Sequence, residues 1–213
     1  MSPRKAAALR GSDDGLRDHL VATAQRLLAE QGAAGLTVRA IARAAGVADG
    51  VLYNHFSDKD ELLAAAVGAH VAAAHADLGT LPAPGTATVR QNLAVYLRAG
   101  LTLHRAVLPV FAGLLATPAV LTRFAESRAR DDDWRELLAA YLRAERDLGR
   151  LAPAADTAAA TAVLVGICHD VVLTAMLPGA TSPPGGSSVA VDVDAVDVDA
   201  IVATLLAGIA PPA

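Results

Sequence analysis

Residues 36–56 read LTVRAIARAAGVADGVLYNHF, and this stretch decides the fold of the N-terminal part of the chain. Its first half has apolar residues at the i, i+3, i+4 and i+7 spacing that lines one face of a helix: Val38, Ile41, Ala42 and Ala45. Thr37 precedes this pattern and can act as an N-cap, because its hydroxyl can accept a hydrogen bond from a free backbone N–H group. Gly46 follows the pattern, where a tight turn can need a positive φ. The spacing therefore predicts a short helix over residues 38–45 that ends in a glycine turn.

The second half of the stretch predicts another short helix. Leu52 and Phe56 are four residues apart and face inward. The remaining residues lie near the outward side: Ala48, Asp49, Gly50, Val51, Tyr53, Asn54 and His55. Small residues on both helices allow the two helices to cross closely. This is the pattern of a helix-turn-helix, whose second helix enters the major groove of DNA.

The segment from about Leu16 to Leu63 resembles the N-terminal DNA-binding domain of the TetR family of transcriptional regulators. The similarity lies in an ordered set of features: an apolar first helix, a break at Gly32, then LTVRAIARAAGV, LYNHF and SDKDELL. The resemblance implies an all-α fold with a three-helix helix-turn-helix domain over residues 16–63. A fourth helix would join it to an all-helical ligand-binding and dimerisation domain over residues 64–213.

Composition agrees with a helical protein. Aromatic residues are only 3% of the 213 residues, so the core must be built from Leu, Val, Ile and Ala, and Ala is the best helix former. The longest apolar stretch, Ala106–Leu121, contains Pro109 and Pro118 and is shorter than the roughly 20 residues that a membrane span needs. We read it as buried core or interface and expect no membrane partner. No secretory signal is visible, and the single cysteine, Cys168, fits a reducing cytoplasm.

Charge does not by itself indicate nucleic-acid binding. The net charge is −4, and no basic block is present. Eight basic and eight acidic residues precede residue 64, so the N-terminal part is neutral and the remainder is acidic. DNA binding must therefore depend on a few placed contacts and on dimerisation.

The expected elements follow from breaks in the pattern. Met1–Gly15 is read as a disordered tail, in preference to a basic arm in the minor groove. One helix is expected over residues 16–31. Another is expected to begin at Ser57 and to run to about Leu78. Ser57 would be its N-cap, with Asp60 at the third helical position. Beyond residue 86 the periodic segments predict helices at about 89–103, 107–115, 118–124, 134–148, 157–177 and 201–209. Residues 178–190 are expected to form a flexible loop, and residues 189–199 a loop or helix lead-in rather than a strand.

By the resemblance, DNA contacts fall on Thr37, Arg39, Ala48, Asp49, Val51, Tyr53, Asn54, His55 and Lys59. Ala48, Gly50 and Val51 are small enough for close approach to base edges, and Asn54 can pair with an adenine edge. Tyr53 and His55 can donate hydrogen bonds to phosphates. Lys59 lies in the first turn of a helix, where an incoming phosphate is favoured. The alternative for each residue is an ordinary solvated side chain.

Asp49 departs from the family pattern, which often has a basic or neutral polar residue there. Its carboxylate can accept a hydrogen bond from the N4 group of cytosine, or it can cap the second helix of the motif. We expect the cap. The departure puts the operator sequence in doubt, not DNA binding itself.

The C-terminal region predicts a homodimer and a small apolar effector. The helix expected at 157–177 has too little polar surface for a monomer, so two copies packing with the last helix form an economical four-helix interface. His169 and Asp170 interrupt it and can bind a ligand or, as we prefer, form hydrogen bonds at the interface. The candidate ligand-binding residues are His104, Phe111, Trp134, Tyr141, Cys168, His169 and Met176, although such residues at helical spacing are more often plain core.

The sequence thus predicts a ligand-responsive regulator, most simply a repressor. As a homodimer it would bind double-stranded operator DNA with a palindromic sequence and be released by the effector, with no cofactor and no metal. One rival is a helical partner-binding protein with a degenerate DNA-binding head. The other is an enzyme that uses the C-terminal helices. The enzyme is disfavoured because neighbours such as Cys168 and His169 point about 100° apart on a helix and no other catalytic set stands out.

Overall fold

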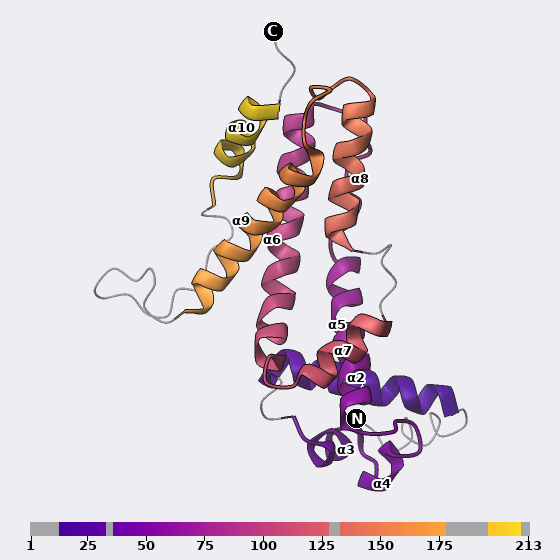
Figure 1. The fold of residues 1–213 in the computed structure, drawn as a ribbon. Coiled ribbons are helices and arrows are strands. Elements are labelled where there is room, and N and C mark those ends of the chain that lie inside the picture. The colour runs from indigo at the N-terminus through magenta and orange to yellow at the C-terminus, as the bar shows by residue number, and fades with distance from the viewer. Residues whose placement is uncertain (1–12, 33–35, 128–132, 178–195, 210–213) are drawn as a thin grey trace. The chain divides into compact units, whose positions relative to one another are not determined.

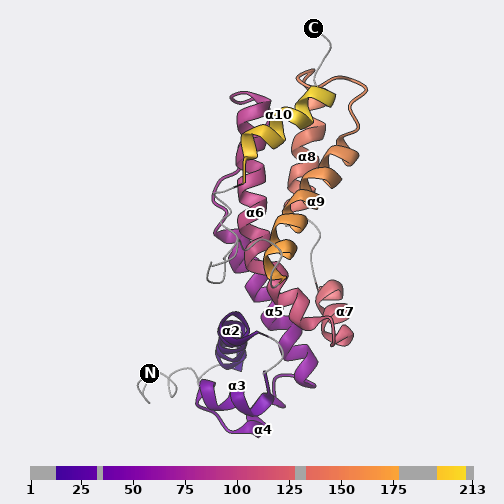
Figure 2. The same cartoon turned by 90° about the vertical axis from the view of Figure 1, so that its left-hand side faces the viewer.

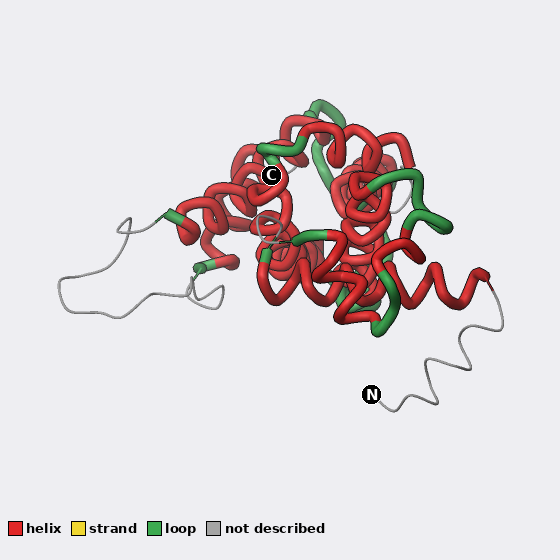
Figure 3. Tube along the Cα trace, turned by 90° about the horizontal axis from the view of Figure 1, so that it is seen from below, coloured by secondary structure: helices red, strands yellow, loops and turns green. Residues whose placement is uncertain are grey.

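The computed structural model describes residues 13–32, 36–127, 133–177 and 196–209. Helices and the loops between them account for these residues, and no strand occurs within the described ranges (Figure 3). The all-α prediction is therefore confirmed. The expected loop over residues 178–190 and nearly all of the expected N-terminal tail lie outside the described residues.

The described residues form two compact units. The first unit falls within Met1–Ala74 and Pro109–Arg128, and the second within His75–Leu108 and Ala129–Ala213. Two helices, α5 and α6, contribute residues to both units (Figure 1).

Apolar side chains from helices and loops fill the core of the first unit. Its helices are α2 (Asp13–Gln31), α3 (Val38–Ala45), α4 (Asp49–Leu52), most of α5 (Lys59–Ala76), the end of α6 (Val89–Leu114) and α7 (Pro118–Ser127). The largest buried contributors are Leu20, Leu28, Leu36, Ile41, Leu52, Phe56, Leu62 and Leu63. Figure 2 shows α2, α3 and α4 gathered at one end of this unit. Helix α2 begins at Asp13, three residues before the expected start at Leu16.

Helix α3 has the ends that the sequence predicts. The Thr37 hydroxyl accepts a hydrogen bond from the N–H of Ala40 at 3.1 Å, and so caps the N-terminus. Gly46 adopts φ +73°, and Val47 donates to the carbonyl of Ala42 at 3.0 Å, which satisfies carbonyls that the helix leaves free. This turn sets the direction in which the chain enters α4.

The cap of α5 is one residue later than predicted. Ser57 was expected to cap with Asp60 at the third helical position, but the helix begins at Lys59 and Asp58 precedes it. The Asp58 carboxylate accepts from the N–H of Glu61 at 2.9 Å, while the Glu61 carboxylate accepts from the N–H of Ser57 at 2.7 Å. Asp58 caps the helix in place of Ser57 because a carboxylate is a stronger acceptor than a hydroxyl, and Glu61 completes the reciprocal pair of hydrogen bonds.

The predicted division of α6 is wrong. Separate helices were expected at about 89–103 and 107–115, but α6 is continuous over Val89–Leu114 with Pro109 inside it. A proline in a helix removes one backbone hydrogen bond, here the one that the carbonyl of Arg105 would accept. The helix continues because buried side chains on both sides of the proline, Leu101, Leu103, Val110 and Leu114, hold it in place. Packing on both sides of Pro109 therefore outweighs the loss of one backbone hydrogen bond.

The second unit is built from the first part of α6 with α8 (Trp134–Asp147), α9 (Thr157–Met176) and α10 (Val198–Ile209). Its core contains Leu93, Leu97, Leu101, Trp134, Leu138, Leu142, Leu164 and Val202. A Cβ atom placed on Gly100 of α6 would lie 2.2 Å from the Trp134 ring, so α6 and α8 pack closely because residue 100 has no side chain. Asp156 caps α9 by accepting from the N–H groups of Ala158 and Ala159.

Helix α9 is long and apolar enough to cross a membrane by length and composition, but only 33% of that stretch is buried in the single chain. Its buried side chains include Leu164, Cys168 and Val172, and they face the core of the second unit. Its exposed side chains are also apolar: Val163 is 50% exposed and Leu173 46% exposed. The helix therefore has two apolar sides, of which the single chain covers one.

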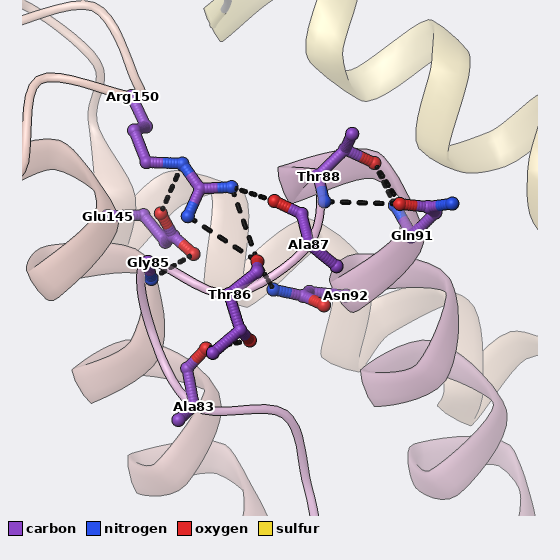
Figure 4. Close-up of polar contacts among 9 residues, drawn as sticks. All are labelled: Ala83, Gly85, Thr86, Ala87, Thr88, Gln91, Asn92, Glu145 and Arg150. Carbon is purple, nitrogen blue, oxygen red and sulfur yellow. Dashed lines mark hydrogen bonds and ion pairs between the residues drawn. The ribbon is translucent and has the colours of Figure 1, made fainter.

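A buried carboxylate that the sequence pattern does not predict joins α8 to the loop before α6 (Figure 4). Glu145 is fully buried, accepts from the N–H of Gly85 at 3.2 Å and forms an ion pair with Arg150 at 3.3 Å. The Arg150 guanidinium donates to the carbonyls of Thr86 and Ala87. A buried charge needs such partners, so this cluster fixes the loop against the end of α8.

Candidate nucleic-acid interface

The outward side of α4 carries the exposed side chains that the motif predicts. Tyr53 is 59% exposed, and Ala48, Asp49, Gly50 and Asn54 are also exposed. Val51 and His55 are half-buried, and Leu52 is buried. One small surface thus presents an aromatic hydroxyl, an amide and a carboxylate, together with backbone near Gly50 that no side chain covers.

Packing beneath this surface fixes its orientation. Leu52 and Phe56 are 2% and 3% exposed, and Phe56 donates its N–H to the carbonyl of Leu52 at 2.9 Å. The guanidinium of Arg17 in α2 lies 4.8 Å from the centre of the Phe56 ring and 3.8 Å from the Glu61 carboxylate. Arg17 therefore links the first helix to the turn that follows α4.

The end of α3 is held by His19, a residue that the sequence pattern does not single out. His19 Nε2 lies 3.1 Å from the carbonyl oxygen of Ala45. Because that oxygen can only accept, Nε2 carries the proton. This bond fixes the C-terminus of α3 to α2, and so it positions the turn at Gly46. A histidine on the polar side of an amphipathic pattern carries no signal of this role.

The predicted cap by Asp49 is wrong. Asp49 is the first residue of α4, the N-cap position belongs to Ala48, and no side chain caps this helix. The Asp49 carboxylate instead forms an ion pair with Nε of Arg39 in α3 at 3.4 Å. A cap residue must precede the first helical turn so that its side chain can reach the N–H groups ahead of it, and Asp49 lies one residue too far along.

The start of α5 places Lys59 among acidic neighbours. Lys59 is the first helical residue, and Asp58, Asp60 and Glu61 surround it in sequence. Arg123 of α7 donates two hydrogen bonds to Asp58, one of them at 2.8 Å, and lowers the pKa of that carboxyl to about 2. Arg123 thereby neutralises one of the carboxylates that would otherwise repel a phosphate approaching Lys59. The remaining predicted contacts, Thr37 and Arg39, are exposed on or beside α3.

The candidate ligand-binding residues separate into three groups. In the second unit, the His104 ring lies 5.3 Å from the Trp134 ring and 4.9 Å from the His169 ring, centre to centre. Cys168 is buried beside His169 in sequence, whereas Tyr141 stacks on Tyr96 at 4.6 Å.

The other two members lie apart from these rings, one in the first unit and one at the end of α9 in the second unit. Phe111 belongs to the first unit, where it packs on Phe124 with ring centres 5.3 Å apart. Met176 is 37% exposed at the end of α9. Phe111 is half-buried in this contact.

Among the candidate ligand-binding residues of the second unit, some buried polar atoms have a hydrogen-bond partner and others do not. His104 Nδ1 donates to the carbonyl of Gly100 at 2.6 Å, and burial lowers the pKa of His104 below its usual value. Trp134 Nε1 and the Tyr141 hydroxyl are buried and have no hydrogen-bond partner among the described residues. Burial also raises the pKa of Cys168 to about 12, so this thiol stays protonated at neutral pH. No group of three or more His, Cys, Asp or Glu side chains that could hold a metal occurs in the described part of the chain.

Comparisons with known proteins agree with the helical motif. The family described as bacterial regulatory proteins, tetR family, matches residues 20–66. No curated protein matches the sequence. Among solved structures, a TetR-family transcriptional regulator from Mesorhizobium loti is 18% identical with a TM-score of 0.65, and the match covers 92% of this chain and 96% of that one.

Two further solved structures contain small molecules. A transcriptional regulator from Saccharomonospora viridis in complex with choline is 19% identical with a TM-score of 0.62, covering 92% of this chain and 98% of that one. The multidrug binding protein EbrR complexed with imidazole is 27% identical with a TM-score of 0.51, covering 92% and 96%. The domain match at residues 20–66 and the shared fold together make this chain similar to TetR-family transcriptional regulators.

Proposed function

We propose that the protein is a ligand-responsive repressor that binds a near-palindromic operator as a homodimer in the cytoplasm. The observation that carries the proposal is the exposed surface of α4, held by Leu52 and Phe56 beneath it. Tyr53 and Asn54 on this surface, with Lys59 at the start of α5, provide donors for phosphates and base edges. The domain at residues 20–66 supports the same reading.

Dimerisation follows from the second apolar side of α9. Val163, Leu173, Met176 and Leu177 are 37–63% exposed in the single chain, although each is large and apolar. Contiguous exposed apolar side chains are typical of an interface. Two copies of α9 and α10 around a two-fold axis would cover this side and place two α4 helices on one DNA duplex.

The effector site that we propose is the His104, Trp134 and His169 group. It combines aromatic surface with two polar groups that can orient a ligand, the unpartnered Trp134 Nε1 and the His169 ring. The choline and imidazole complexes of the fold relatives make a small organic molecule a reasonable class. We propose an apolar effector with one hydrogen-bond acceptor for Trp134.

Release would follow from a change in the separation of the two DNA-binding heads. Half-sites must lie on one face of the duplex, about 34–36 Å apart, so a small movement of each α5 spoils the register. The effector can act only through its different affinity for the two arrangements, and a typical coupling lowers operator affinity roughly 5- to 150-fold.

The test is a mobility shift with DNA from upstream of the protein's own gene and its neighbours, in excess nonspecific competitor. The proposal expects one shifted species that a footprint resolves into two half-sites. Trp134 is the single tryptophan of the chain, so its fluorescence reports ligand binding directly. A ligand that changes this fluorescence should also release the DNA. Tight ligand binding that leaves operator affinity unchanged would refute the effector part, and equal weak affinity for every duplex would refute the whole.

A further inference from the structure

We propose that Asp49 selects cytosine at one symmetric position in each operator half-site, and that Arg39 holds the Asp49 carboxylate in place for this contact. The inference rests on the proposed operator binding and names the residue that sets part of its sequence preference. It concerns a residue at which this chain carries a negative charge on the surface proposed to face DNA.

The fold gives Asp49 no role in capping. Ala48 occupies the N-cap position and α4 has no side-chain cap. The Asp49 carboxylate is therefore not used to cap the helix. Asp49 is 51% exposed, and its partner in the described part of the chain is Arg39 at 3.4 Å. Arg39 is itself 87% exposed, so both side chains of the pair lie at the surface.

The surroundings of Asp49 allow close approach by a base. Ala48 and Gly50 flank it, both exposed, and a Cβ atom added to Gly50 would meet nothing within 4 Å. The Asp49 carboxylate is therefore the longest side chain among three consecutive exposed residues. It reaches beyond a backbone segment that can itself enter a groove.

Hydrogen-bond chemistry then selects the base. An ionised carboxylate has only acceptors, so it needs a donor on the base edge. In the major groove, guanine presents acceptors at N7 and O6, and thymine presents an acceptor at O4. Adenine offers a donor at N6 but places the N7 acceptor beside it, which repels a carboxylate. Cytosine presents N4 as a donor, and it is the base that this side chain fits.

Arg39 makes a carboxylate tolerable at this surface. A lone negative charge is repelled by DNA phosphates, which would lower affinity for every sequence. The guanidinium at 3.4 Å offsets the charge of Asp49. Its five donors allow it to contact a phosphate as well, so the pair can bridge the backbone and the base edge. Arg39 is in this sense a positioning residue for Asp49.

The experiment is selection from a random duplex library with the wild-type protein and with Asp49→Ala and Asp49→Asn. We expect the wild-type site to contain cytosine at one symmetric position, where any other base weakens binding roughly 5- to 100-fold. Asp49→Ala should lose preference at that position alone and keep the rest of the site. Asp49→Asn should favour adenine there, because an amide supplies both the donor and the acceptor that adenine needs. Arg39→Met should weaken the cytosine preference while Asp49 is still present.

Three results are decisive against the inference. An unchanged preference at every position in Asp49→Ala would show that the carboxylate reads no base. A uniform gain of affinity for all duplexes in that variant would show that it only repels phosphate. If the wild-type protein selects no site at all, the proposed function fails and this inference fails with it. If the wild-type protein selects a site but no position in it responds to Asp49→Ala, the inference fails while the proposed function stands. Circular dichroism of each variant verifies that the domain is folded.

Discussion

The Asp58 carboxylate accepts two hydrogen bonds from the guanidinium of Arg123, 65 residues further along the chain. Asp58 also caps α5 by accepting from the N–H of Glu61. One carboxylate therefore joins α7 to the N-terminus of α5, next to Lys59 and the turn that follows α4. This arrangement gives the first unit a defined dependence on pH.

Replacing Arg123 with alanine should destabilise the protein above pH 4 and matter less at lower pH. The folded pKa of Asp58 is about 2 and its ordinary value is 3.8. The ionised form is favoured by folding, so the contribution is full above the ordinary value and is lost as pH falls through the folded value. Urea unfolding from pH 5 to pH 2.5 measures it, with Arg90→Ala on α6 as the control. A difference between wild type and Arg123→Ala that does not shrink on acidification would contradict this account of the pair.

Gly100→Ala should destabilise the second unit by about 1–3 kcal/mol, the usual cost of adding atoms to a filled core. The new Cβ atom would lie 2.2 Å from the Trp134 ring, which is 1% exposed and has no room to move freely. Gly68→Ala on α5 is the matched control, because nothing lies within 4 Å of its Cβ position and alanine favours a helix by about 1 kcal/mol. Chemical denaturation should therefore move in opposite directions for the two variants. Equal stability of both would mean that Trp134 does not pack on Gly100.

Val163→Asp should convert a dimer to a folded monomer. Val163 is 50% exposed in the single chain, so aspartate is tolerated there, whereas an unpaired charge buried in an interface costs roughly 3–5 kcal/mol. The dimer constant should weaken by about two to three orders of magnitude. Light scattering at micromolar concentration measures the mass, and Leu137→Asp, at a 40% exposed site on α8, should remain dimeric. A wild-type protein that is itself monomeric would refute the α9 interface.

Tyr53→Ala and Lys59→Ala should weaken binding to operator and nonspecific duplexes alike, because both residues are proposed to contact phosphate. Lys59→Ala should also reduce the slope of log affinity against log salt by about one unit, since one phosphate contact is lost. Tyr53→Phe removes only the hydroxyl and separates its hydrogen bond from its packing. Fluorescence anisotropy over a range of salt concentrations measures both quantities. A salt slope that is unchanged in Lys59→Ala would exclude Lys59 from the interface.

The local pattern of the sequence predicted the helix-turn-helix closely. Thr37 and Gly46 bound α3 as expected, because capping and positive φ are properties of single residues and their nearest neighbours. The same reasoning failed by one residue at Asp49 and at Ser57. Ala48 holds the N-cap position of α4 without a side-chain cap, and Asp58 caps α5 in place of Ser57. At Pro109 a correct local penalty was outweighed by packing along α6.

Contacts between distant residues could not be predicted from the pattern. Such contacts join Arg123 to Asp58, His19 to Ala45, and the buried Glu145 to Gly85, and none of these separations shows a periodic pattern. The first two contacts hold the helices around the surface of α4, and the third fixes the loop before α6 against the end of α8. The predicted DNA-contacting residues are exposed where the motif puts them, and their contacts with DNA stay a prediction.

Selection of duplexes from a random library by the purified wild-type protein, followed by determination of the mass of the complex, tests the central claim most directly. We expect one near-palindromic site with two half-sites on one face of the duplex, bound by two copies of the chain. Tyr53→Ala in the same experiment should enrich the same site at lower yield, because the lost phosphate contact weakens binding to all sequences. Recovery of unrelated sequences with equal weak affinity by a folded wild-type protein would contradict the account.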